Sequence, residues 1–223
     1  MIARSPLRSI LGTALVAVLC AACASEPSPR NVEVTHDGLV RVANSRVERA
    51  WIKPDVDFSQ YTEVGLLDAF VSFRRNWRMN HSRVRTRDME RIKTTLAEEF
   101  RRIFTDSLQS GGYPVVTDAD DHVLLIRPAI IDLDVAAPDT MSAGRSTSFT
   151  ASPGAMTLVI ELYDSVSNEI LARAIDRRRA RNVGNIQWAT SGSNREAARR
   201  ILRRWANLLV SRLDEVHHGE PGG

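Results

Sequence analysis

The sequence predicts a single layered α+β domain in which a mainly antiparallel sheet is covered by two amphipathic helices. Two long segments repeat apolar residues at helical spacing, and several others have the apolar patterns of strands. A chain of 223 residues is also the size that one hydrophobic core serves. Hydrophobic residues make up 43% and charged residues 26%, which is the usage of a folded globular protein.

The strands are expected where β-branched and aromatic residues gather between turn signals. They are predicted at 38–43, 47–52, 63–71, 113–116, 122–135, 155–163 and 169–180. Lys53-Pro54 ends the second strand because proline cannot donate to a strand ladder. The last two form a hairpin across the polar turn 164–168.

The first helix is expected to begin after Thr86, a suitable N-cap, with Asp88 and Glu90 at the positive end of its dipole. Gly111-Gly112 should end it. Its apolar side recurs at helical spacing: Met89, Ile92, Leu96, Phe100, Ile103, Phe104 and Leu108. The segment therefore predicts a helix that covers a sheet face.

The second helix is expected to begin at Ser193, which forms a capping box with Glu196. Its apolar stripe lies opposite a face of arginines and comprises Ala198, Ile201, Leu202, Trp205, Leu208, Leu209 and Val216. Trp205 lies within this stripe. We therefore expect its indole to pack against the sheet.

The N-terminal segment has the pattern of a secretion signal. Arg4 and Arg8 form a basic region, the run 10–19 is apolar, and the small residues 21–22 precede Cys23. The apolar run is about half of the roughly 20 residues that span a bilayer. We therefore expect a cleaved signal peptide rather than a permanent transmembrane helix.

Two cleavage sites are compatible with this signal. Residues 19–23 resemble a lipobox, in which the sulfur of Cys23 receives a diacylglycerol before the signal is cut, although Cys20 stands where leucine is usual. The alternative is an A-x-A site at 22–24, which would release a soluble periplasmic protein beginning at Ser25. The polar residues that follow, rich in proline and serine, suit a spacer and favour the lipoprotein.

The expected organisation is a signal peptide at 1–22, a lipidated N-terminus and tether at 23–45, the α+β domain at 46–216 and a tail at 217–223. The lipid places the protein in the bacterial cell envelope. Ala24 follows the cysteine where aspartate would signal retention in the inner membrane. We therefore expect the outer membrane, with the domain facing the periplasm.

Charge and cysteine content narrow the possible partners. The formal net charge is +3, and it falls to about +1 without Arg4 and Arg8, so the sequence has no nucleic-acid signature. Both cysteines, Cys20 and Cys23, precede the domain, which therefore holds no disulfide and no cysteine metal site. No phosphate-binding glycine loop, G-x-S-x-G or H-E-x-x-H motif is present, and we predict no metal and no cofactor.

From Val47 to the last helix the chain resembles the bacterial lipoproteins of domain-of-unknown-function family 3313. Several pieces match in order: Trp51-Ile-Lys-Pro54 before Phe58-Ser-Gln-Tyr61, Gly112-Tyr113-Pro-Val-Val116 before the strand Leu124 to Asp134, Glu161-Leu-Tyr-Asp164 before Glu169-Ile-Leu171, and Trp205-Ala206 in the final helix. The resemblance covers roughly three quarters of the chain. It implies an envelope lipoprotein and supports Cys23, and it carries over no catalytic residue.

Two acidic groups are candidates for chemistry. The run Asp118-Ala-Asp-Asp-His122 could bind a divalent cation or move protons, but aspartates of this kind are also typical of a solvated turn. Asp132 and Asp134 alternate with apolar residues and could form an acid/base pair on one strand face. Any water-facing strand shows the same alternation. The turn and the water-facing strand are the favoured interpretations.

A basic run closes the hairpin and could meet phospholipid headgroups, lipid A phosphates or an acidic protein. It comprises Arg177, Arg178, Arg179 and Arg181, and a solvated strand end is the plain alternative. We expect a non-enzymatic accessory or structural lipoprotein that presents a binding surface to another envelope component. The competing hypothesis is a periplasmic hydrolase or metal-dependent enzyme built on Asp118–His122 or Asp132/Asp134.

Overall fold

A computed structural model describes residues 33–82, 84–135, 154–179 and 191–218, the side chains of 191–194 excepted. In chain order its elements are β1 (Val40–Arg41), β2 (Arg49–Ile52), η1 (Phe58–Gln60), β3 (Glu63–Leu66), β4 (Phe70–Phe73), α1 (Trp77–Asn80), α2 (Thr86–Ser110), β5 (Val115–Val116), β6 (Val123–Asp134), β7 (Ala155–Asp164), β8 (Ile170–Arg179) and α3 (Ser191–His218). These elements confirm the predicted α+β class.

The strands form one mixed sheet in the order β1-β2-β8-β7-β6-β3-β5, and β4 also pairs with β6. The pairs β1–β2, β2–β8, β8–β7 and β7–β6 are antiparallel. The pairs β3–β5, β3–β6 and β4–β6 are parallel. The antiparallel part contains the long strands, and its centre is the predicted hairpin of β7 and β8.

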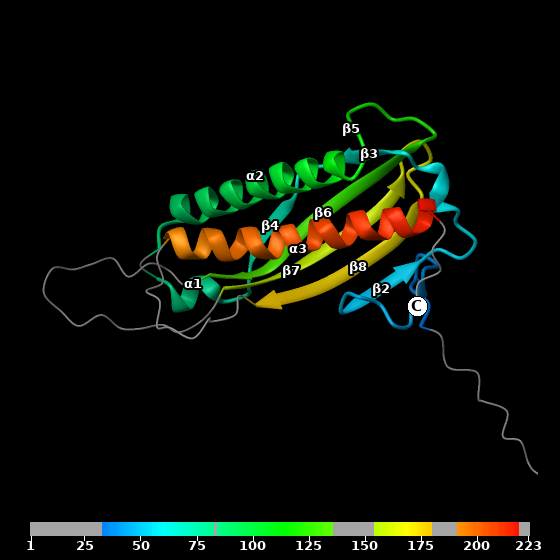
Figure 1. Ribbon diagram of the computed structural model, residues 1–223. Coiled ribbons are helices and arrows are strands. Elements are labelled where there is room, and N and C mark those ends of the chain that lie inside the picture. The colour runs from blue at the N-terminus through cyan, green and yellow to red at the C-terminus, as the bar shows by residue number, and fades with distance from the viewer. Residues whose placement is uncertain (1–32, 83, 136–153, 180–190, 219–223) are drawn as a thin grey trace, which may run out of the picture. The chain divides into compact units, whose positions relative to one another are not determined.

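Helices α2 and α3 lie side by side across one face of the sheet (Figure 1). The buried side of α2 consists of Leu96, Phe100, Ile103, Phe104 and Leu108, as its spacing predicts. The rings of Phe100 and Phe104 stack with their centroids 3.9 Å apart. From α3, the buried residues Ile201, Leu202, Trp205, Ala206 and Leu213 join the same core. The prediction that Trp205 packs against the sheet is confirmed.

Several predicted boundaries are wrong. The strand expected at 63–71 is two strands: β3 pairs with the first half of β6 and β4 with the second half. Thr86 is the first residue of α2 and not its N-cap; Arg85 holds that position and makes no side-chain cap. Helix α3 begins at Ser191, so Ser193 lies inside it. Gly111 caps α2 as expected, and Gly112 follows with φ of +86°.

The segment before β2 forms part of the sheet layer. Strand β1 pairs with β2, and Val34 bridges to Val40 on the free edge of β1. The tight turn between them buries Leu39 completely. Much of the described part of the segment that we expected to be tether therefore packs on the sheet.

Candidate functional site

The sheet face that neither α2 nor α3 covers is here called the open face. Side chains alternate along each strand, so the strand register identifies its members. One cross-strand row on it, the charged row, runs over five strands and comprises Arg41, Trp51, Arg173, Glu161 and Arg127.

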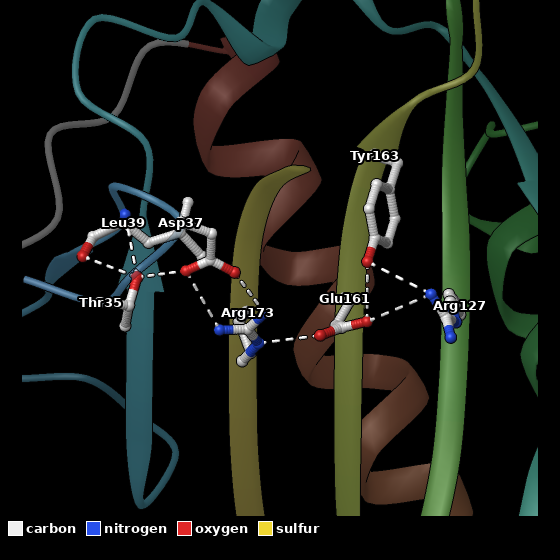
Figure 2. Close-up of polar contacts among 7 residues, drawn as sticks. All are labelled: Thr35, Asp37, Leu39, Arg127, Glu161, Tyr163 and Arg173. Atoms are coloured by element: carbon white, nitrogen blue, oxygen red, sulfur yellow. Dashed lines mark hydrogen bonds and ion pairs between the residues drawn. The ribbon is translucent and has the colours of Figure 1, made fainter. Parts of the chain in front are cut away.

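Ion pairs join the charged row to the turn before β1 (Figure 2). Arg173 binds Oδ2 of Asp37 at 2.5 Å through Nη2 and Oε1 of Glu161 at 2.9 Å through Nε. The second oxygen of Glu161 accepts a 2.9 Å hydrogen bond from the hydroxyl of Tyr163 and lies 3.9 Å from Nη1 of Arg127. One arginine thus connects two carboxylates that lie far apart in the sequence.

This network shifts the pKa values of its members. Hydrogen bonds from Thr35 and from Arg173 lower the pKa of Asp37 to about 2. Burial and the hydrogen bond to Glu161 raise the pKa of the Tyr163 phenol. Partial burial alone would lower the pKa of Arg173, but its bonds to Asp37 and Glu161 raise it. These shifts keep the Asp37 carboxylate and the Arg173 guanidinium charged over the physiological pH range.

Trp51 lies between Arg41 and Arg173 in the charged row, and only 5% of it is exposed. The guanidinium carbon of Arg41 lies 4.9 Å from its ring centroid, and that of Arg49 lies 5.9 Å away. Both distances allow cation–π attraction. Among the described residues, the indole Nε1 has no hydrogen-bond partner.

The next row of the open face, here called the apolar row, runs parallel to the charged row. It comprises Arg49, Ile175, Val159, Ala129 and Phe70 in strand order. The three central side chains are half-buried by their neighbours in the sheet. Phe70, at the end of the row, is 64% exposed. The open face therefore places an exposed aromatic ring beside arginines.

The predicted arginine run is divided between the two faces of the sheet. Arg177 and Arg179 are exposed on the open face, and Oδ2 of Asp132 lies 4.0 Å from Nη1 of Arg177. Arg178 points to the helix face, where its Nε donates to Oδ2 of the buried Asp176 at 2.5 Å. Arg181 lies outside the described residues. Strand alternation thus leaves Arg177 and Arg179 as candidates for an anionic partner.

The acidic run Asp118–His122 forms the turn between β5 and β6. The backbone N–H of Asp120 donates to Oγ of Ser165, and that hydroxyl donates to the carbonyl of Asp120. Nδ1 of His122 lies 3.2 Å from the carbonyl oxygen of Gln60. The run therefore makes the contacts of a turn that joins neighbouring loops.

The carboxylates of Asp132 and Asp134 pair with different arginines in the structure. Asp132 has φ of +52° at a bulge where the register of β6 shifts between Ile131 and Asp134. Oδ2 of Asp134 lies 3.4 Å from Nη2 of Arg74, whereas Asp132 faces Arg177. Each carboxylate thus has its own arginine, and the pairing needed for shared-proton chemistry is missing here.

A metal-binding group and a hollow are two further features that could mark a reaction centre in the described ranges. No group of three or more histidine, cysteine, aspartate or glutamate side chains within 33–82, 84–135, 154–179 and 195–218 could hold a metal ion. A hollow of about 400 Å³ is lined by Ser211, Asp214, Glu215 and His218 of α3. None of the predicted acidic candidates lines it.

The predicted lipidation site, Cys23, lies outside the described residues. His217, the first residue of the predicted tail, lies in α3, and its Nε2 is 3.0 Å from the carbonyl oxygen of Tyr61. Among the helices that the structure describes, none has both the length and the apolar character needed to cross a bilayer.

The sequence analysis missed the contacts that organise the open face. Glu161 and Arg173 face one another because the register of the β7–β8 hairpin shifts between Leu162 and Tyr163. A register counted from the predicted turn would have placed Glu161 opposite Leu171, so it would have missed this pair. No local pattern indicates the contact of Asp37 either, because Asp37 reaches Arg173 only where the turn before β1 folds over the sheet.

Residues 34–209 match the profile of a protein family described as "Protein of unknown function (DUF3313)". This range contains nearly all of the described elements. The comparison with curated proteins gave no match.

The comparison with solved structures found chains of low sequence identity and low structural similarity. PelC from Paraburkholderia phytofirmans, described as a dodecamer, is 12% identical over 67% of this chain and 88% of that chain, with a TM-score of 0.35. A protein from Caulobacter crescentus CB15, assigned as a lipoprotein, is 12% identical over 74% and 96%, with a TM-score of 0.35. A Helicobacter pylori protein, assigned as a homolog of neuraminyllactose-binding hemagglutinin, is 10% identical over 72% and 91%, with a TM-score of 0.34.

Proposed function

Because the chain belongs to DUF3313, a family of unknown function, we propose a function from its own residues: a non-enzymatic envelope lipoprotein, anchored through Cys23, that presents a binding surface. The anchor holds the domain at the outer membrane, facing the periplasm. The domain itself supplies the surface on which another envelope component docks.

The observation that carries this proposal is the open face. Helices α2 and α3 bury one face of the sheet and leave the other with charged and apolar rows side by side. Ion pairs fix the guanidinium of Arg173 and the carboxylates of Asp37 and Glu161. A charged surface held in one geometry is suited to recognition, because little side-chain freedom is lost on binding.

The lipid anchor is supported by the residues around Cys23. Basic residues, an apolar run and two small residues precede that cysteine in the order that lipoprotein processing requires. A diacylglycerol on the sulfur and a third acyl chain on the freed amine exceed the two-chain threshold for stable anchoring. Stable retention at a membrane then requires no transmembrane helix.

Cell fractionation with two cysteine variants tests the anchor. The protein should sediment with membranes, stay there in high salt and dissolve in detergent. Cys23→Ser should abolish acylation and leave the signal uncleaved by the lipoprotein peptidase. Cys20→Ser is the matched control and should remain acylated and anchored. Salt-extractable protein in the unaltered strain would contradict the proposal, and a sucrose gradient that places it in inner membranes would contradict the outer-membrane assignment.

A further inference from the structure

We infer that the open face contacts the anionic phospholipid headgroups of the leaflet in which the Cys23 lipid is inserted. The inference rests on the proposed anchor and names the anionic phospholipid surface as the envelope component that the open face binds. It follows from where the chain enters the domain and from which side chains surround that point.

The chain enters the domain at the free edge of β1, which borders the open face. The backbone N–H of Arg41 donates to the carbonyl of Glu33, which places the first described residue on the free edge of β1. The next residues turn back, and Asp37 reaches Arg173 on β8, two strands inward from β1. Figure 2 shows this turn beside the charged row, with α3 behind the strands.

The place where the tether joins the domain favours the surfaces nearest to it. Residues 23–32 separate the lipidated sulfur from the domain, and a fully extended chain of that length reaches about 35 Å. Residue 33, where this tether ends, lies on the edge of β1 that borders the open face. The outer sides of the helices lie across the sheet, so the tether would have to pass around its edge for them to face the lipid.

The side chains of the open face suit a phosphate-bearing surface. Arg49, Arg127 and Arg177 have side chains that are 49%, 65% and 38% exposed. Phe70 adds an exposed aromatic ring, which can bury apolar surface at the boundary between headgroups and acyl chains. Guanidinium groups bind phosphate oxygens in a bidentate manner.

On the described part of this face, the arginines outnumber the carboxylates of their ion pairs: Arg41, Arg49, Arg127, Arg173, Arg177 and Arg179 stand against Asp37, Glu48, Asp132 and Glu161. Asp37 and Glu161 are both held by Arg173, which is partly buried. As far as the structure describes this face, the exposed arginines make only long ion pairs: 3.9 Å for Arg49 with Glu48, 3.9 Å for Arg127 with Glu161 and 4.0 Å for Arg177 with Asp132. Helix α3 also exposes arginines on its outer side, but its one tryptophan is buried in the core. Charge together with an exposed aromatic ring distinguishes the open face.

The test uses the acylated protein reconstituted in vesicles. Both natural cysteines lie within residues 1–23 and Cys23 carries the lipid, so a single added cysteine can be labelled alone. A fluorophore is attached to Phe70→Cys on the open face or to Arg203→Cys on α3. Quenching by neutral acrylamide is measured on phosphatidylcholine vesicles with and without phosphatidylglycerol, after flotation has separated vesicle-bound protein.

The label at residue 70 should be protected from acrylamide on phosphatidylglycerol vesicles and lose that protection in high salt, whereas the label at 203 should not change. Replacing Arg49, Arg127 and Arg177 with glutamine should lower the ratio of surface-bound to free domain by about fivefold per arginine. The matched triple replacement of Arg200, Arg203 and Arg204 should leave that ratio unchanged.

Equal protection at residues 70 and 203, or none, would overturn the inference. Protection on neutral vesicles that grows with protein density would also overturn it, because a second copy of the chain would then occupy the face. Protein that fails to float with any vesicles contradicts the proposed anchor instead. Failure of the anchor and failure of the surface assignment are thus distinguished in the same samples.

Discussion

The indole Nε1 of Trp205 in α3 donates a 2.7 Å hydrogen bond to Oδ2 of Asp176 in β8, and both residues are buried. The same carboxylate accepts from Nε of Arg178 and from the backbone N–H of Glu48. A buried carboxylate is tolerated only when such donors surround it. This contact fixes α3 over the strands whose opposite side forms the open face.

Truncation of the indole should destabilise the domain. Trp205→Ala should lower the free energy of unfolding by about 3 to 5 kcal/mol, because it removes a buried aromatic ring and leaves a cavity. Trp205→Phe should cost about 1 to 3 kcal/mol, since it keeps an aromatic ring but leaves Asp176 without one donor. Urea denaturation of both variants checks this. An unchanged midpoint for Trp205→Ala would contradict the placement of α3.

The contact between the two long helices should depend on pH. Hydrogen bonds from Arg199 on α3 and Arg102 on α2 lower the pKa of Glu99 to about 2 in the folded state. A carboxylate with a lowered folded-state pKa stabilises the fold above its unfolded value of about 4.3, and this stability is lost as the pH falls toward 2.

Glu99→Gln should therefore be less stable than the unaltered protein at neutral pH. Between pH 4.5 and 2, the variant should lose less stability than the unaltered protein loses. Thermal unfolding across this range measures the difference. Glu98→Gln, at an exposed neighbouring position, is the control and should keep the original pH dependence. Parallel curves for all three proteins would refute the assigned role of Glu99.

Arg173 and Glu161 should be energetically coupled. Their side chains are 19% and 20% exposed and join through a 2.9 Å contact, so solvent screens them less than a surface pair. A double-mutant cycle with Arg173→Gln and Glu161→Gln should give a coupling of about 1 kcal/mol. The exposed pair Asp88 and Arg91 on α2 serves as control and should give about 0.3 kcal/mol. Equal couplings would show that the network adds no rigidity to the open face.

The bulge in β6 should set which residues position 132 tolerates. Asp132 has φ of +52°, a region that aspartate and asparagine enter more readily than branched residues. Asp132→Asn should leave the unfolding free energy within about 0.5 kcal/mol, whereas Asp132→Val should cost about 1 to 3 kcal/mol. Denaturant titration distinguishes the two. Equal effects of both replacements would show that the backbone at 132 is not strained.

Local patterns predicted the helices and the hairpin. The spacing of Phe100, Phe104 and Leu108 records the buried side of α2, and Trp205 lies in the stripe that α3 buries. The β7–β8 hairpin was predictable because its partners are adjacent in sequence. Each of these signals depends on neighbours within a few residues or one turn.

Long-range pairing explains what was missed. Parallel pairing of β3 and β4 with successive halves of β6 breaks the segment 63–71 into two strands, and no pattern within that segment records the distant partner. The same holds for the contact of Asp37 with Arg173. Alternation along β8, which sequence does show, would have divided the arginine run between the two faces.

Mass spectrometry of the mature N-terminus tests the central claim most directly. The proposal predicts a chain that begins at Cys23 and carries a diacylglycerol on the sulfur and a third acyl chain on the amine. An unmodified chain that begins at Ser25 would contradict it, because the A-x-A cleavage would then release the domain from the membrane.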